Sequence, residues 1–237
     1  MPRLVLLRHG QSQWNLENRF TGWVDVDLTS AGEAEASSAG ERIAAAGIAL
    51  DHAFASVQTR AIRTAVLALS AAGPLWIPLE KSWRLNERHY GALTGLDKAQ
   101  TAQEHGEAQV RLWRRSYDIA PPPLAPGGPY DFAADRRYRG MTPPATESLK
   151  TTLERVDPYW REAIAPTLSR GAAVLVAAHG NSLRALIKIL FRVGDEEIVA
   201  VEFPTGNPLL IDLSAEIEPL AARYLDPATA KPLPALP

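Results

Sequence analysis

Short apolar runs alternate with longer helix-like segments along this chain, and this alternation restricts the fold more than any other feature. Apolar runs of about four to eight residues, bounded by turn residues, are typical of strands that are buried on both faces. The expected strands are residues 3–7, 51–56, 75–79, 172–178 and 208–213. The expected helices are residues 30–46, 59–72, 97–117 in two pieces broken near Gly106, 148–164 and 181–191. This order of elements predicts a layered α/β fold with a mostly parallel sheet.

Two of the expected helices begin at residues that commonly cap a helix. Ser30 and Glu33 have the spacing of a capping box, in which a hydroxyl and a carboxylate satisfy the first free N–H groups. Asn181 and Ser182 precede the last expected helix and are good N-cap residues. These signals predict where each helix starts.

Length and composition place the chain among ordinary globular proteins. With 237 residues and no shift in composition, residues 1–237 are expected to form one domain, with an irregular insertion at about 118–147 and a loose tail at about 226–237. The absence of cysteine excludes disulfides and thiolate chemistry. A net charge of -2 argues against nucleic-acid binding, and no apolar run is long enough for a membrane span. We therefore expect a cytoplasmic protein with neither nucleic acid nor a membrane as its partner.

Two histidines share the same local context, and they are the first candidates for chemistry. His9 follows the apolar run Leu4–Leu7 after Arg8, and His179 follows Val174–Ala178; glycine comes next in both cases. Ligands of open α/β sheets bind at the carboxyl ends of strands. If the two strands are neighbours, both imidazoles face one pocket. The alternative is that each histidine is a half-buried residue at the end of a strand, without a chemical role.

Arg60 opens the helix expected at 59–72, where a cation is unfavourable for the helix dipole. One interpretation is that Arg60 and Arg8 together clamp an anion bidentately. The other interpretation is a surface arginine with no role.

Several further motifs, which occur in matching order between about residues 3 and 225, carry a family resemblance. They are Arg8-His9-Gly10-Gln11-Ser12-Gln13-Trp14-Asn15, Asn18-Arg19-Phe20-Thr21-Gly22-Trp23, Asp25-Val26-Asp27-Leu28-Thr29, Arg60-Ala61-Ile62-Arg63-Thr64, Leu85-Asn86-Glu87-Arg88-His89-Tyr90-Gly91, Trp113-Arg114-Arg115 and Ala178-His179-Gly180-Asn181-Ser182-Leu183-Arg184-Ala185-Leu186. Together they closely resemble the cofactor-dependent phosphoglycerate mutases of the histidine phosphatase superfamily. The resemblance implies a three-layer sandwich whose central, mostly parallel sheet is flanked by helices.

The resemblance also implies catalytic roles for five residues. His9 is expected to become phosphorylated, and nearby Arg8 and Arg60 favour its neutral, nucleophilic form. His179, Arg8 and Arg60 are expected to hold the phosphoryl oxygens, since cationic donors stabilise the transferred group. Glu87 is expected to act as general acid and base at the substrate hydroxyl. In this cycle 2-phosphoglycerate and 3-phosphoglycerate interconvert in glycolysis and gluconeogenesis, through a phosphohistidine intermediate.

The ligands follow from the same resemblance. The expected cofactor is 2,3-bisphosphoglycerate, which primes the histidine, and no metal is expected because no cluster of metal-ligand residues is evident. Small-molecule phosphoglycerates are the expected partners, and relatives form homodimers or homotetramers. Substrate contacts are expected from Asn15, Thr21, Gly22, Tyr90, Lys98, Arg114, Arg115, Gly180 and Asn181. Lys98 with Arg114 and Arg115 supplies a second anion pocket, which a mutase needs and a plain phosphatase does not.

The chain departs from the family pattern at three places. Gln11 stands where glutamate is common, and the segment 118–147 differs in detail near Gly127-Gly128. The chain also ends in Lys231-Pro232-Leu233-Pro234, where the family has a longer end rich in alanine and lysine. A poorer lid of this kind would admit water to a phosphorylated His9 and raise hydrolysis relative to transfer. Two alternatives stay open beside the mutase: a phosphatase or bisphosphoglycerate synthase/phosphatase on the same scaffold, and a non-catalytic binder of phosphorylated ligands.

Overall fold

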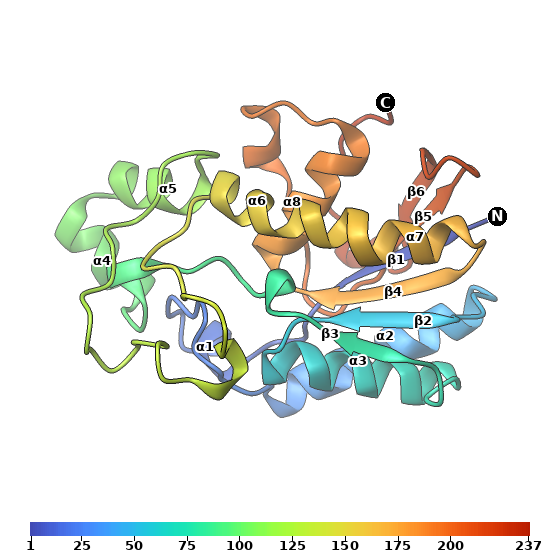
Figure 1. The fold of residues 1–237 in the computed structure, drawn as a ribbon, viewed down its shortest axis with the longest axis horizontal. Coiled ribbons are helices and arrows are strands. Elements are labelled where there is room, and N and C mark those ends of the chain that lie inside the picture. The colour runs from blue at the N-terminus through green and yellow to red at the C-terminus, as the bar shows by residue number, and fades with distance from the viewer.

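A six-stranded sheet runs through the middle of the molecule, as Figure 1 shows. The computed structural model describes all residues 1–237. The strands are β1 (Arg3–Arg8), β2 (His52–Ala55), β3 (Leu79–Lys81), β4 (Ala173–Ala178), β5 (Leu209–Leu213) and β6 (Pro219–Tyr224), in the order β3-β2-β4-β1-β5-β6. The pairings β3–β2, β2–β4 and β4–β1 are parallel, whereas β1–β5 and β5–β6 are antiparallel. The prediction of a mostly parallel sheet is confirmed.

Helices cover both faces of this sheet (Figure 1). Helices α2 (Ser30–Ala45) and α3 (Thr59–Ala72) lie on one side, and α6 (Leu149–Tyr159), α7 (Ala165–Ser169) and α8 (Gly180–Phe191) lie on the other. The central strand β1 shows why both faces of the sheet need a covering layer. Leu4 and Leu6 pack with side chains of α6 and α8, whereas Val5 and Leu7 pack with side chains of α2 and α3. Successive strand residues point to opposite faces, so a continuous apolar run needs a layer of helices on each side. The three-layer sandwich is confirmed.

The molecule has eight α-helices, which are α1 (Gln13–Leu16), α2 (Ser30–Ala45), α3 (Thr59–Ala72), α4 (Lys98–His105), α5 (Glu107–Arg115), α6 (Leu149–Tyr159), α7 (Ala165–Ser169) and α8 (Gly180–Phe191). Of these, α2 to α6 and α8 lie close to the predicted positions, whereas α1 and α7 were not predicted. The π-helical turn Trp160–Ile164 joins α6 to α7. Pro158 lies just before this turn and lacks the N–H that an α-helix needs, and such a position favours a wider turn.

Four details of the prediction were wrong. The expected strand at 75–79 is a turn, because Leu75 and Trp76 are exposed and Pro78 has no N–H to donate; the strand begins only at Leu79. Strand β6 was missed, since it starts at a proline and only its first and last residues are buried. The N-cap of α2 is Thr29, whose hydroxyl accepts from the N–H of Gly32, and not Ser30. The N-cap of α8 is His179, and not Asn181.

The irregular segment 118–147 contains one regular piece, the 3₁₀ turn Arg136–Tyr138. Tyr138 is buried, its ring lies 4.6 Å from that of Trp23, and its hydroxyl accepts from the side-chain amide of Asn86 at 3.0 Å. Arg137 forms an ion pair with Asp25 at 2.6 Å. The segment therefore packs against the loop that precedes Glu87.

The last residues follow the outside of the sandwich. Asp226 forms an ion pair with Arg42 at 3.1 Å, and the 3₁₀ turn Pro227–Thr229 follows it. Leu233 packs against the hydrophobic core between the sheet and helices α6 and α8. Residues 232–236 line a cavity of about 350 Å³ beside the end of α8. None of the helices is long and apolar enough to span a bilayer.

Candidate active site

His9 and His179 meet at one edge of the sheet. Strands β1 and β4 are parallel neighbours, with Arg8 paired to Ala178, so the residue after each strand emerges at the same place. The centroids of the two imidazole rings are 5.0 Å apart and the ring planes are inclined by 59°. Both rings are buried, with 3% and 0% of the residue exposed. The structure thus brings both histidines into one pocket, as their sequence context predicts.

The ring of His9 is fixed by the backbone. Its Nδ1 donates to the carbonyl oxygen of Gly10 at 2.7 Å, which leaves Nε2 free to act as a nucleophile. Burial, reinforced by the positive charges of Arg60 and Arg8, holds the pKa of His9 well below its usual value. A Cβ at Gly10 would meet the carbonyl of Gly32 in α2, and a Cβ at Gly32 would meet the carbonyl of Gln11, so neither position has room for one. His9 is therefore neutral near pH 7 and is held in one orientation.

His179 is fixed by Ser56, which the sequence analysis did not select. The Oγ of Ser56 lies 2.7 Å from Nε2 of His179, and the same oxygen accepts from the N–H of Gln58 at 3.2 Å. Ser56 is fully buried at the end of β2, so its hydroxyl hydrogen needs an acceptor, and Nε2 of His179 is the one in reach. This assignment leaves the hydrogen of His179 on Nδ1. Burial, with Arg60 and His9, lowers the pKa of His179 well below its usual value.

Arg60 and Arg8 lie beside the two rings. Arg60 is 1% exposed in the first turn of α3, where it donates to the carbonyls of Val24 and Gly22, both at 2.9 Å. Arg8 donates through Nη1 to the carbonyl of Phe203 at 2.8 Å. Burial lowers the pKa of Arg60 to about 10, which still leaves it charged near pH 7.

Three buried nitrogens in this pocket have no hydrogen-bond partner within the protein. They are Nε of Arg8, Nε of Arg60 and Nδ1 of His179. Almost all buried N–H groups in proteins have a hydrogen-bond partner. Three buried N–H groups without a partner in one pocket therefore point to a ligand. The ligand must offer several acceptor oxygens, and a negative charge favours it beside two guanidinium groups.

Glu87 faces this group of donors from the loop that follows the 3₁₀ turn Trp83–Leu85. Its Oε1 accepts from the N–H of Arg88 at 2.7 Å, and from the N–H and side-chain amide of Asn181 at 3.2 and 2.9 Å. Its own N–H donates to the side chain of Gln58 at 2.9 Å. Because Oε1 is occupied three times, Oε2 is the oxygen available for proton exchange.

A cationic cleft of about 200 Å³ opens next to these residues. Six of the nine predicted substrate contacts line it together with two of the five catalytic candidates: Arg8, Glu87, Tyr90, Lys98, Arg114, Arg115, Gly180 and Asn181. A second, larger cavity of about 700 Å³ shares Lys98, Arg114 and Arg115 with the first. Burial, followed by the charges of Arg114 and Arg8, lowers the pKa of Lys98 to about 8. This crowding of cations favours a ligand with more than one negative charge.

Three predicted substrate contacts line neither of these two cavities. Asn15 caps its own short helix, where its Oδ1 accepts from the N–H of Ser12 at 3.2 Å. Thr21 is buried, and Gly22 adopts a positive φ of 52° and presents its carbonyl to Arg60. Gly22 thus acts on the site by holding an arginine.

Two arginines near the cleft were also missed from the sequence. Arg88 is fully buried, and its Nε and Nη1 have no partner while Nη2 donates to the carbonyl of Arg114 at 3.0 Å. Arg184 donates to Oδ1 of Asn181 at 3.1 Å, which turns the amide nitrogen of Asn181 toward Glu87. Their positions in two motifs, next to Glu87 and one helical turn after Gly180, were the available signals.

The site and fold define a class. The family model described as histidine phosphatase superfamily (branch 1) matches residues 4–138, more than half of the chain. The chain belongs to the histidine phosphatase superfamily, and the resemblance read from its motifs is confirmed.

Known proteins of high similarity carry one name. A 2,3-bisphosphoglycerate-dependent phosphoglycerate mutase of Caulobacter sp. (strain K31) is 71% identical over 236 residues, which is 100% of both chains. A protein of the same name from Caulobacter vibrioides (strain NA1000 / CB15N) is 68% identical over 234 residues, 99% of both chains. A solved structure of a mycobacterial glucosyl-3-phosphoglycerate phosphatase with VO3 is similar in fold, with a TM-score of 0.71 at 23% identity over 94% of this chain and 97% of that one.

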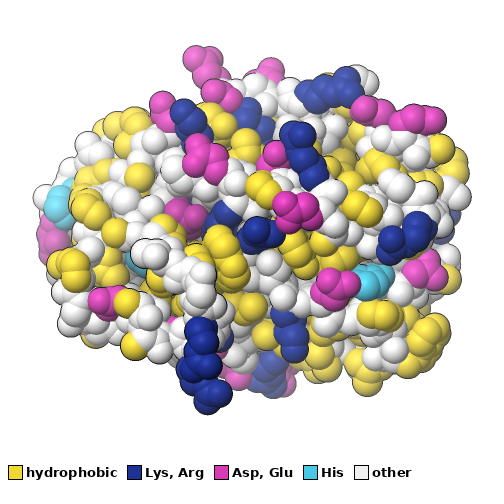
Figure 2. Space-filling model, viewed as in Figure 1, with side chains coloured by type: hydrophobic (Ala, Val, Ile, Leu, Met, Phe, Trp, Pro, Cys, Tyr) yellow, Lys and Arg dark blue, Asp and Glu magenta, His cyan; other side chains and the backbone are white.

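Charged side chains of both signs are interspersed over the face of the molecule seen in Figure 2, without an extended patch of one sign. No group of three or more His, Asp or Glu side chains is arranged to hold a metal ion.

Proposed function

We propose that this chain interconverts 2-phosphoglycerate and 3-phosphoglycerate through a phosphohistidine on His9, primed by 2,3-bisphosphoglycerate. The observation that carries the proposal is the group of three unpartnered buried donors beside the free Nε2 of His9. Relatives with this named activity are 68–71% identical over the whole length, which supports the same assignment here.

The pocket suits phosphoryl transfer in both directions. Nε2 of His9 attacks the phosphorus atom, the bond from phosphorus to the substrate oxygen breaks, and Oε2 of Glu87 gives a proton to that oxygen. In the return step Glu87 takes the proton from a substrate hydroxyl while that oxygen attacks the phosphohistidine. Arg8, Arg60 and His179 stabilise the charge on the moving group, and such positioned donors supply most of the catalysis in phosphoryl transfer.

The neighbouring cleft suits the rest of the substrate. A phosphoglycerate carries a carboxylate and a phosphate, so it needs two anion sites around one histidine. Lys98, Arg114 and Arg115 lie on one side of the cleft, and Arg8 joins that cleft to the histidine pocket. The same two sites fit 2,3-bisphosphoglycerate, which supplies the phosphoryl group that primes His9. A cytoplasmic location and a homodimer or homotetramer remain predictions.

The deciding experiment measures mutase turnover with and without trace 2,3-bisphosphoglycerate, in the presence of a chelator, beside a phosphate-release assay. We expect primer-dependent turnover that the chelator does not reduce. His9→Ala should abolish both turnover and labelling of the protein by the primer. Turnover retained in His9→Ala would falsify the nucleophile assignment, and phosphate release without isomerisation would favour a phosphatase.

A further inference from the structure

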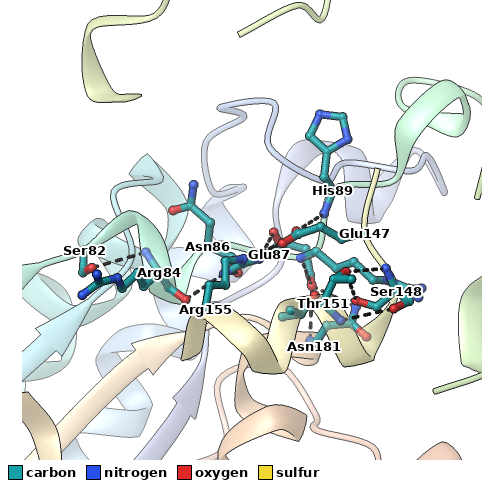
Figure 3. Close-up of polar contacts among 12 residues, drawn as sticks. Ser82, Arg84, Asn86, Glu87, His89, Glu147, Ser148, Thr151, Arg155 and Asn181 are labelled. Atoms are coloured by element: carbon teal, nitrogen blue, oxygen red, sulfur yellow. Dashed lines mark hydrogen bonds and ion pairs between the residues drawn. The ribbon is translucent and has the colours of Figure 1, made fainter. Parts of the chain in front are cut away.

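A buried ion pair lies directly behind Glu87, outside the cleft. Arg155 on α6 and Glu147, which lies just before that helix, are 8% and 4% exposed. Nε and Nη2 of Arg155 donate to the two carboxylate oxygens of Glu147, at 2.6 and 2.9 Å. Figure 3 shows the pair beneath the loop that carries Glu87. This geometry is a bidentate pair, which is directional as well as strong.

The remaining hydrogens of Arg155 all bind the backbone of that loop. Nη1 donates to the carbonyls of Arg84 at 2.7 Å and Asn86 at 3.1 Å, and Nη2 donates to the carbonyl of Glu87 itself at 3.0 Å. With the two bonds to Glu147, five donated bonds account for the five N–H groups of a guanidinium. Lysine has three donors at one point and cannot reproduce this fork.

Glu147 holds the other side of the same loop. Its Oε2 accepts from the N–H of His89 at 2.8 Å, and its own backbone N–H donates to the carbonyl of His89 at 2.9 Å. The loop backbone is therefore held at residues 84, 86 and 87 by the guanidinium and at residue 89 by Glu147. Glu87 lies between these fixed points.

The position of this pair argues for a role beyond stability. Removing two charges from water is expensive, and a buried ion pair of this kind is often no more stabilising than apolar side chains of similar volume. The loop 84–89, however, has few backbone partners of its own, and its carbonyls need donors from elsewhere. A guanidinium that meets three of them in fixed directions sets the path of the loop.

We infer that Arg155 and Glu147 are positioning residues for proton transfer by Glu87. From the front, Asn181 and the N–H of Arg88 hold Oε1 of the carboxylate; from behind, Arg155 and Glu147 hold the backbone from which that carboxylate projects. The carboxylate can then reach the substrate oxygen only while both sets of contacts persist. This inference rests on the proposed function, in which Glu87 exchanges a proton with the substrate oxygen.

Two phosphate donors with different leaving groups distinguish this positioning role from a general structural role. When the bond to phosphorus breaks, a sugar-acid alkoxide needs a proton from Glu87, whereas p-nitrophenolate leaves without one. A displaced Glu87 therefore slows phosphorylation of His9 by 2,3-bisphosphoglycerate and hardly affects phosphorylation by p-nitrophenyl phosphate. General damage to the pocket slows both.

The test compares Arg155→Lys with Arg161→Lys, which changes an exposed arginine six residues further along the same helical segment and serves as the matched control. For Arg155→Lys we expect kcat of the mutase reaction to fall about 10–100-fold, which is part of the roughly 10²–10⁴-fold that a general acid–base group contributes, with KM changed less than about 3-fold. The rate of phosphoenzyme formation from p-nitrophenyl phosphate should stay within about 3-fold of the original. Arg161→Lys should change none of these values.

A double-mutant cycle with Glu87→Gln completes the test. If Arg155 acts through Glu87, adding Arg155→Lys to Glu87→Gln causes no further loss of kcat, because the two changes remove the same function. Equal losses with both phosphate donors, or independent losses in the cycle, would overturn the inference. If Arg155→Lys does not fold, Glu147→Gln takes its place with the same expectations. Failure of the original enzyme to isomerise phosphoglycerate would instead refute the proposed function.

Discussion

Three buried histidines are held neutral in the folded protein, and this makes its stability depend on pH in a defined direction. Burial lowers the pKa of His9 and of His179 well below the ordinary value of 6.5, and the nearby arginines lower them further. Burial also lowers the pKa of His89 to about 4, where the charge of Glu147 opposes the shift and that of Arg155 adds to it. In the unfolded chain all three titrate near 6.5.

The sign of the effect follows from proton counting. Between pH 6.5 and each folded-state pKa, the unfolded chain binds more protons than the folded chain, so the free energy of unfolding rises with pH in this window and falls as the solution is acidified. Each histidine contributes a slope of up to about 1.4 kcal/mol per pH unit. For His89, the interval from 6.5 to about 4 corresponds to a total of about 3 kcal/mol.

Urea unfolding followed by tryptophan fluorescence, repeated at steps between about pH 7.5 and pH 5, measures this slope. His89→Asn should lower the slope near pH 5.5 by about 1 kcal/mol per pH unit, whatever it does to the absolute stability. His105→Asn, at an exposed position, should leave the slope unchanged. A slope that His89→Asn does not alter, or a stability that increases on acidification from about pH 7 to 5, contradicts the assignment of neutral buried rings.

Further expectations concern Ser56 and Gly32, which packs against the loop that follows His9. Ser56→Ala removes the donor to Nε2 of His179, so phosphorylation of His9 should slow about 10-fold, and ¹⁵N NMR should show mixed tautomers of His179; an unchanged spectrum with the hydrogen on Nδ1 contradicts the assignment. Gly32→Ala places a Cβ against the carbonyl of Gln11 and should destabilise the protein by about 1–3 kcal/mol or more, whereas an unchanged Tm would show that α2 can move away from the His9 loop.

The centre of the site was predictable because it depends on local sequence and on one topological rule. Apolar runs that end in His-Gly specify both the strands and the residues that follow them, and parallel neighbours bring those residues to one edge. His9 and His179 were predicted for this reason. Ser56 ends β2, which pairs with β4 at the same edge, but a serine at the end of a strand carries no distinguishing signal by itself.

The supports of the site were not predictable, since they depend on contacts between distant segments. Arg155 donates to carbonyls 68 to 71 residues earlier in the chain. Its position in the sequence of α6 does not distinguish it from an exposed arginine. Strand β6 was missed for a related reason. It lies at the edge of the sheet with only its first and last residues buried, so it shows neither an apolar run nor a clear alternation.

The arrangement of charges in the pocket has two effects, one before and one after a ligand enters. Without an anion, burial, with Arg60 and Arg8, disfavours protonation of both rings and keeps Nε2 of His9 unprotonated. In the proposed function, a bound phosphoryl group would bring negative charge next to the same rings, raise the pKa of His179 and favour its protonated form, whose Nδ1–H is a stronger donor. His179 would thus become a better donor only when the group it stabilises is present. Because the Ser56 hydroxyl keeps the hydrogen on Nδ1, the nitrogen without a partner in the protein, this response would need no rotation of the ring.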